Sequence, residues 1–153
     1  MLQFIKQFLF GKEVRFYDPI LGELKTRVKK ANTTVSYTWT GEYILPGQKK
    51  KTFFIVEGNY LAPDKVQLNS LYYIIENLDE IIAKVDTELK AKPSVKSRFK
   101  QQWSDAFYLA AILPYAADGG NAFELSFEPL AEEDTDYVGL IWQNGILIDI
   151  IAN

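Results

Sequence analysis

The stretch that decides the fold is DKVQLNSLYYIIENLDEIIAKVDTELKA, at residues 64–91. Its apolar side chains recur at alternating spacings of 3 and 4 residues, which is the period of an amphipathic helix laid on a sheet. Pro63 and Asp64 are suited to a helix start, and Pro93 ends the pattern. We therefore expect one long helix at about residues 64–91. The apolar positions are Leu68, Leu71, Ile75, Leu78, Ile82, Val85 and Leu89.

Strand patterns lie on both sides of this helix. They show the alternation, or the short apolar runs, that are typical of β-strands. Asn144-Gly145 tolerates the positive φ values of a two-residue turn, so it predicts a hairpin between the last two strands. The expected strands before the helix are 13–17, 21–29, 35–40 and 52–57, and those after it are 107–113, 123–127, 137–142 and 146–150.

Two other segments have helical patterns. Residues 2–9 predict a short amphipathic helix that ends at Gly11. Residues 94–103 favour a second short helix, and the apolar run 107–113 either continues it or forms a strand. We prefer the strand, because residues 118–121 (DGGN) then make a hairpin connection to the next one. The chain is expected to be a single domain, 1–153, of α+β class, with a mainly antiparallel sheet and a C-terminal β-meander.

Composition excludes several kinds of site. The chain has no Cys and no His, so disulfides, thiolate metal sites, zinc sites with His ligands and Ser-His-Asp triads are impossible. No EF-hand, P-loop or dinucleotide-binding pattern occurs, so we expect no metal and no cofactor. No signal peptide or membrane-spanning pattern is visible, and we expect a cytoplasmic protein that binds no membrane.

The charge is distributed unevenly along the chain. All 17 Lys and Arg lie at or before Lys100, whereas every charged side chain in residues 101–153 is an Asp or a Glu. This asymmetry suggests a charged partner, and an acidic face would fit a basic protein. The alternative is that both sets of charges are solvated faces of one compact domain. Trp142 is a candidate aromatic anchor for that partner, with a core position as the equal alternative. The acidic contact residues that we predict are Asp118, Glu132, Glu133, Asp134 and Asp136.

Other charged residues have simpler interpretations. Glu124 and Glu128 have the opposite parity to Phe123, Leu125 and Phe127, so they are expected to face solvent rather than to form a catalytic carboxylate pair. The lysines at 49–51 lie near aromatic residues, as in single-strand nucleic-acid sites. They equally suit the exposed edge of a strand, and we expect no nucleic acid to bind, because the sequence pI is about 5.1 and no nucleic-acid-binding signature occurs.

Two short motifs carry a family resemblance. Residues 18–24 (DPILGEL) enter a strand, and residues 39–41 (WTG) follow before a strand, a long helix and closing strands. This order resembles a loose set of bacterial domains of unknown function, some of which look like immunity proteins encoded beside secreted toxins. The resemblance implies a fold and a genetic neighbourhood, and it assigns no catalytic residue.

Three functions follow as hypotheses. The first is a non-enzymatic intracellular protein-binding domain, with an immunity protein as its most specific form. The second is a small-ligand-binding protein or enzyme that uses an aromatic-lined groove between helix and sheet. The third is a subunit of a larger assembly that pairs through the helix stripe. Tyrosines that could supply polar groups in the groove are Tyr17, Tyr37, Tyr72, Tyr73 and Tyr108.

Overall fold

In the part of the chain that the structure describes, eight strands form one sheet, and their spatial order is the order of the chain. The computed structural model describes residues 11–91, 103–117, 120–131, 133 and 136–152. All neighbouring strands are antiparallel except β4 and β5, which are parallel. The strands are β1 (Lys12–Asp18), β2 (Gly22–Val28), β3 (Tyr37–Tyr43), β4 (Thr52–Gly58), β5 (Phe107–Ala117), β6 (Gly120–Pro129), β7 (Val138–Gln143) and β8 (Ile146–Ala152).

The α+β class and the mainly antiparallel sheet are thus confirmed, with one parallel pair that the sequence did not indicate. Residues 107–113 are a strand, as preferred. The hairpin between β7 and β8 has φ of 53° at Asn144 and 76° at Gly145, the positive values that the Asn-Gly pair predicted. The helix expected at 2–9 lies outside the described residues. So does most of the helix expected at 94–103, of which the description begins at α4 (Trp103–Ala106).

The expectation of one long helix is wrong in one respect. The segment forms two helices, α2 (Lys65–Glu76) and α3 (Leu78–Ala91). Asn77 ends α2, because its φ of −112° and ψ of 18° leave the helical range. Its backbone N–H makes the last helical bond, to the Tyr73 carbonyl at 3.0 Å, and its side-chain Nδ2 donates to the same carbonyl at 2.8 Å. The next helix begins at once, with the Ile81 N–H donating to the Asn77 carbonyl at 3.1 Å. A break of a single residue leaves the apolar spacing intact, so the sequence pattern does not reveal it.

Side-chain caps fix the start of α2 to the end of β4. The Asp64 carboxylate accepts the N–H groups of Val66 and Gln67, at 2.9 and 3.1 Å. The buried Gln67 amide in turn accepts the Glu57 N–H at 2.7 Å, and the Asp64 N–H donates to the Glu57 carbonyl at 2.8 Å. The helix therefore leaves the sheet in a defined direction.

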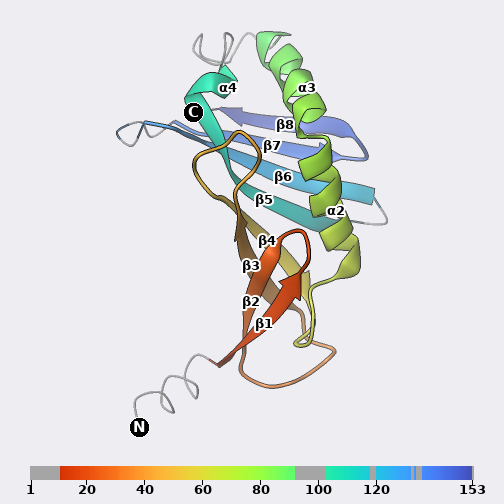
Figure 1. The fold of residues 1–153 in the computed structure, drawn as a ribbon. Helices are drawn as coiled ribbons and strands as arrows, with labels where there is room; N and C mark the ends of the chain where they lie inside the picture. The colour runs from red at the N-terminus through yellow and green to blue at the C-terminus, as the bar shows by residue number, and fades with distance from the viewer. Residues whose placement is uncertain (1–10, 92–102, 118–119, 132, 134–135, 153) are drawn as a thin grey trace.

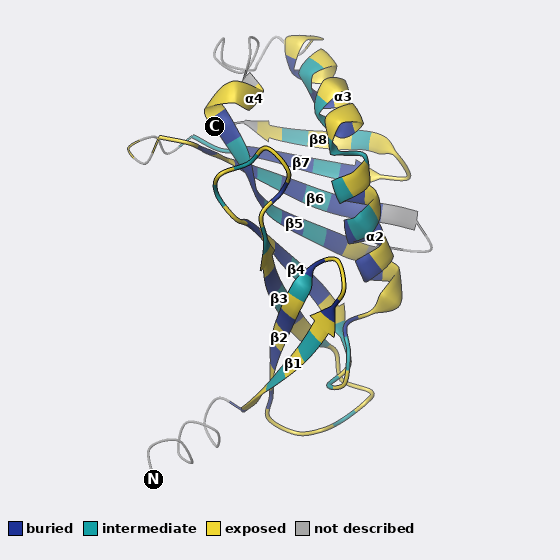
Figure 2. Ribbon diagram, viewed as in Figure 1, coloured by how far each residue is buried: buried dark blue, intermediate teal, exposed yellow. Residues whose placement is uncertain are grey.

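Both long helices lie on the same face of the sheet, across β5 to β8, while β1 to β4 extend beyond them (Figure 1). We call the face under the helices the inner face and the opposite one the outer face. Buried residues line the inner face (Figure 2), where Leu71, Ile74 and Val85 of the helices pack in one core with Phe54 and Leu125 of the sheet. Burying each such side chain contributes about 1.5–3 kcal/mol.

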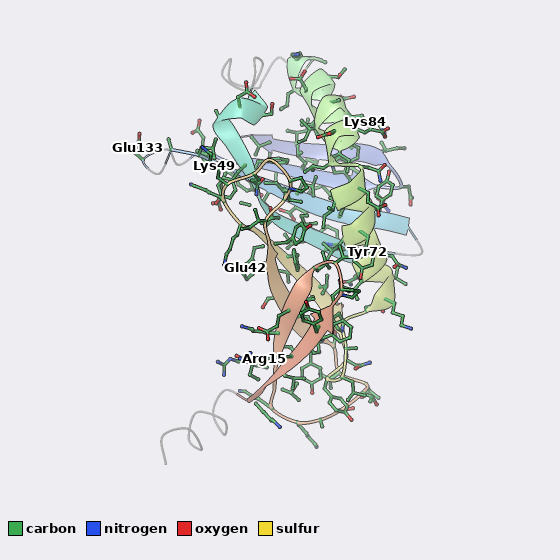
Figure 3. All side chains as sticks on the ribbon, viewed as in Figure 1. Arg15, Glu42, Lys49, Tyr72, Lys84 and Glu133 are labelled. Carbon is green, nitrogen blue, oxygen red and sulfur yellow. The ribbon has the colours of Figure 1, made fainter. Side chains whose placement is uncertain are left out.

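A buried carboxylate joins the β1–β2 turn to α2. Asp18 Oδ1 accepts the N–H groups of Ile20 and Leu21, at 2.9 and 2.8 Å, as the Asp-Pro turn predicted. Its other oxygen accepts the hydroxyl of Tyr72, which is labelled in Figure 3. Burial and this contact with Asp18 raise the pKa of Tyr72 to about 12. The turn that carries the DPILGEL motif therefore has a structural role.

Candidate functional site

The outer face of the sheet has two contrasting parts. The two long helices, α2 and α3, both pack on the inner face, so neither of them covers it. On β1 and β2 two of its cations form ion pairs: Arg15 lies 2.8 Å from Glu13 and 3.0 Å from Glu23, and Lys25 lies 2.9 Å from Glu23. On β5 to β8 the acids have no Lys or Arg in the same strands, because the last basic residue of the chain is Lys100.

Tyrosine hydroxyls take the place of cations on β5 to β8. Tyr115 donates to one oxygen of Glu124 at 2.5 Å, and Tyr137 donates to the other at 3.3 Å. Tyr108 donates to Glu128 at 2.8 Å. We call this set, Tyr108, Tyr115, Glu124, Glu128 and Tyr137, the tyrosine–glutamate face.

Burial and the neighbouring carboxylates set the protonation of two of these tyrosines. Burial, and then the hydrogen bond to Glu128, raises the pKa of Tyr108 to about 12. Burial, and then the hydrogen bond to Glu124, raises the pKa of Tyr115 to about 12. Both phenols thus stay protonated at neutral pH and act as hydrogen-bond donors, rather than as bases.

Tyr137 reaches this face because a glycine lies beneath it. Tyr137 comes just before β7, and its hydroxyl also lies 3.3 Å from Ser126 Oγ on β6. A Cβ placed on Gly139 would lie 2.5 Å from the Tyr137 hydroxyl oxygen. Only a glycine at position 139 leaves room for the Tyr137 side chain to lie across β7. Gly139 pairs directly with Ser126 of β6.

Apolar side chains fill the space between the acids. Cross-strand pairing puts Leu113, Glu124, Ile141 and Asp149 in one row across β5 to β8. Toward the middle of the sheet Phe53 is 39% exposed, as is Tyr115. An apolar centre with aromatic residues and polar groups around it is the usual anatomy of a protein interface.

One cation already lies on this face. Lys50 Nζ is 4.8 Å from the centroid of the Tyr108 ring, whose hydroxyl donates to Glu128. The ring face attracts the ammonium, and the carboxylate beyond it adds to the attraction. Tyr115 with Glu124 repeats the tyrosine–carboxylate pair, and among the described residues no Lys or Arg lies over its ring. The arrangement can therefore receive a cationic side chain from outside.

The residues predicted for an acidic face are only partly placed. Asp118, Glu132 and Asp134 lie outside the described residues. Glu133 is exposed on the loop before β7, on the opposite side of the view in Figure 3 from Lys84 of α3. Asp136 is half-buried and has an interaction partner. The structure thus does not bring these five acids together in its described part.

Trp142 lies in the core, the second of the two alternatives for this residue. It is 2% exposed and stacks on Phe123, with ring centroids 5.9 Å apart, so it cannot be an exposed anchor of the folded protein. The alternation of Val138, Leu140 and Trp142 on the inner face gives the reason. Its indole Nε1 has no hydrogen-bond partner among the described residues.

A groove of about 430 Å³ lies between α3, the β3–β4 loop and the ends of β5 and β6. Gln48 fixes the loop to β5, because its side-chain oxygen accepts the Leu109 N–H at 3.0 Å and its Nε2 donates to the Leu109 carbonyl at 3.1 Å. Lys49, Asp79 and Asp105 lie at its polar edge. The apolar lining includes Leu45, Leu78, Ile82, Phe107, Leu109 and Phe127.

Of the five tyrosines expected in that groove, only Tyr108 lines it. Tyr17 is 78% exposed on β1, and Tyr73 is 43% exposed on α2. Tyr37 donates to the Lys30 carbonyl, and Tyr72 donates to Asp18. The expectation of an aromatic-lined groove is wrong for these four residues, because each lies on a different element from the groove.

An eight-stranded sheet with helices on one face, and a charged outer face, defines the protein only as an α+β domain with an open sheet surface. Comparison of the chain with protein-family models, with curated proteins and with solved structures finds no match. The resemblance of residues 18–24 and 39–41 to bacterial immunity domains therefore stays a prediction. Within the described residues, no three potential metal ligands are grouped, and no helix is both long and apolar enough to cross a membrane.

Proposed function

We propose that the protein is a non-enzymatic protein-binding domain whose tyrosine–glutamate face holds a basic protein. The observation that carries the proposal is the Lys50–Tyr108–Glu128 contact. In it, a lysine of the chain itself binds a tyrosine–glutamate pair of this face in the way that we propose for a lysine or arginine of the partner. Glu124 and Tyr115 present the same chemistry without a cation in place. A partner's Lys or Arg would lie on the Tyr115 ring and pair with Glu124.

The charge distribution supports the same partner class. The last third of the chain has no basic residue, so its field attracts cations and speeds their encounter. A toxin neutralised inside the cell that makes it is the specific partner that the sequence resemblance implies. The predicted contacts Glu133 and Asp136 precede β7, the same strand that Tyr137 adjoins.

Affinity capture from a lysate of the producing cells tests the proposal. Wild type, Tyr115→Ala and Tyr17→Ala would be used as bait at low and at high salt, with the retained proteins identified by mass spectrometry. Tyr17 is the matched control, since it is an exposed tyrosine on β1, outside the tyrosine–glutamate face. We expect a basic protein that wild type and Tyr17→Ala retain at low salt, that salt releases, and that Tyr115→Ala fails to retain. Equal retention by all three baits would contradict the proposal.

The groove beside α3 supports a second candidate function, the binding of a small apolar molecule. The specific observation is that Gln48 holds the loop away from α3 and leaves about 430 Å³ between them. A small molecule extracted from the purified protein and identified by mass spectrometry would support this function. Its loss in Ile82→Trp, which fills the groove, with retention in Tyr115→Ala, would separate this function from the first.

A further inference from the structure

The two edges of the sheet differ in how they are protected. Exposed strand edges attract further strands, and natural proteins blunt them with charged residues, above all lysine. β1 has the sequence KEVRFYD and carries Lys12, Glu13 and Arg15 along a strand of seven residues. β8 has the sequence ILIDIIA, with Asp149 as its single charge and no Lys, Arg or Pro.

The side chains of β8 are also unusually apolar for a free edge. Among the described residues β8 pairs only with β7, and it is the last strand of the sheet that they form. Ile146 is 69% exposed, Ile148 is 55% exposed and Ile151 is 41% exposed. The register shift beside Trp142 leaves Ile148 without an opposite residue. Such a bulge is itself one of the devices that blunt a sheet edge, so β8 differs from β1 in its lack of lysine and arginine rather than in having no protection. These isoleucines would lose water contact if another strand lay beside β8.

The position of Asp149 identifies the kind of strand that fits. Asp149 pairs with Ile141, which pairs with Glu124 of the tyrosine–glutamate face. The edge thus continues the acidic row of the outer face. An added strand would meet the Asp149 carboxylate there, one oxygen of which accepts the N–H of Ile150 at 2.8 Å and the other of which is the acceptor that the proposal uses. A second copy of the chain fits poorly, because antiparallel pairing centred on β8 would bring two Asp149 carboxylates together, and like charges directly opposite are destabilising.

We propose that β8 receives an extended segment of a basic partner as a ninth strand, with a Lys or Arg next to Asp149. The inference rests on the proposed function, since it assigns a second contact to the same partner. Main-chain hydrogen bonds along β8 would supply affinity, and the charge beside Asp149 would supply selectivity. The strand would lie at the border of the tyrosine–glutamate face, so that one partner can engage both.

The probe is an acetylated and amidated peptide of sequence KVKVKVK, and its control is KPKPKPK. The two peptides have equal charge, but proline cannot donate to a strand ladder. Backbone hydrogen exchange of the full-length protein would be followed residue by residue. We expect KVKVKVK to slow exchange in β8 and to bind at least about tenfold more tightly than KPKPKPK. Equal binding of the two peptides, or binding without protection of β8, would overturn the inference.

A matched pair of lysine substitutions gives the second test. Ile148→Lys protects the β8 edge, whereas Tyr17→Lys adds the same charge to β1, and both residues are exposed. We expect Ile148→Lys to weaken KVKVKVK binding at least about tenfold and Tyr17→Lys to leave it within about twofold. Equal effects would show that net charge alone governs binding and would overturn the inference.

The oligomeric state tests the other possible occupant of the β8 edge, a second copy of the chain. Light scattering should show a monomer for wild type; a dimer that Ile148→Lys dissociates would assign the edge to a second copy and overturn the inference. The two proposals also fail differently. If a basic protein is captured through Tyr115 but KVKVKVK leaves β8 unprotected, the edge inference fails and the proposed function stands. If KVKVKVK protects β8 but no basic protein is captured, the proposed function fails.

Discussion

The outer faces of β1–β2 and of β5–β8 belong to one sheet, but their exposed carboxylates have different kinds of partner. On β1 and β2, Arg15 and Lys25 share Glu23, and exposed pairs of this kind contribute little to stability. On β5 to β8, Glu124 and Glu128 receive tyrosine hydroxyls, which satisfy their oxygens without cancelling their charge. An ion-paired acid and a hydrogen-bonded acid therefore look alike in composition but present different fields to a partner, because the charge of the first is cancelled and the charge of the second remains negative.

The largest effect should come from truncating Phe54, a core residue where strands β1 to β4 meet strands β5 to β8. Phe54 of β4 is fully buried, covers Gly41 of β3 and pairs with Ile112 of β5. Phe54→Ala should lower the free energy of unfolding by about 3–5 kcal/mol, because it leaves a cavity where the parts join. Denaturant unfolding, followed by probes in each part, measures this. A variant as stable as wild type would show that the join carries little of the core's stability.

Charge reversal should separate the two faces in binding. Glu128→Lys replaces an acid of the tyrosine–glutamate face, and Glu23→Lys makes the same change on β2. We expect Glu128→Lys to weaken the basic partner's affinity by about 10–100-fold at low salt, and Glu23→Lys to change it by less than about twofold. Calorimetry with the captured partner measures both. Equal losses would mean that total charge, and not the position of the acid, determines binding.

Gly139→Ala should have a smaller and more selective effect. The new methyl group would meet the Tyr137 hydroxyl, which can turn away at the cost of its contacts with Glu124 and Ser126. We expect about three- to tenfold weaker partner binding, with stability changed by less than about 1 kcal/mol. Tyr137→Phe is the control, since it removes the hydroxyl and leaves the glycine. If Gly139→Ala unfolds the protein while Tyr137→Phe does not, the glycine serves the backbone rather than the tyrosine.

The smallest effect concerns alkaline pH. Because the pKa values of Tyr108 and Tyr115 are raised to about 12, the folded protein holds protons that the unfolded chain releases above about pH 10. Their contribution to stability is therefore complete below about pH 10 and is lost as pH rises toward about 12. Ultraviolet titration of tyrosinate should show a late-titrating group, and denaturant midpoints should fall over the same range. Titration of every tyrosine near pH 10 would contradict the assigned environments.

The element order followed from local patterns, and the tyrosine–glutamate face did not. Parity alone placed Glu124 and Glu128 on the solvent side, and the structure confirms it, with Glu124 half-buried and Glu128 exposed. Their tyrosine partners depend on the register of β5 with β6, which shifts between Leu109 and Ala111, and the sequence pattern did not indicate that shift. The alternation of Val138, Leu140 and Trp142 could have indicated a core tryptophan. The break at Asn77 was hidden, because one residue between helices keeps the 3.6-residue period.

Among the described strands β4 and β5 form the one parallel pair, and this pair has a consequence for the speed of folding. Each set of four strands is built from chain neighbours, so its hairpins can close quickly and independently. The Phe53–Ala111 pairing, in contrast, closes the whole helical segment into a loop. The chain must lose the conformational entropy of this long loop before it gains the stabilising contact. We expect the docking of β4 against β5 to limit the folding rate, so mutations at this junction should slow folding more than mutations within either hairpin set.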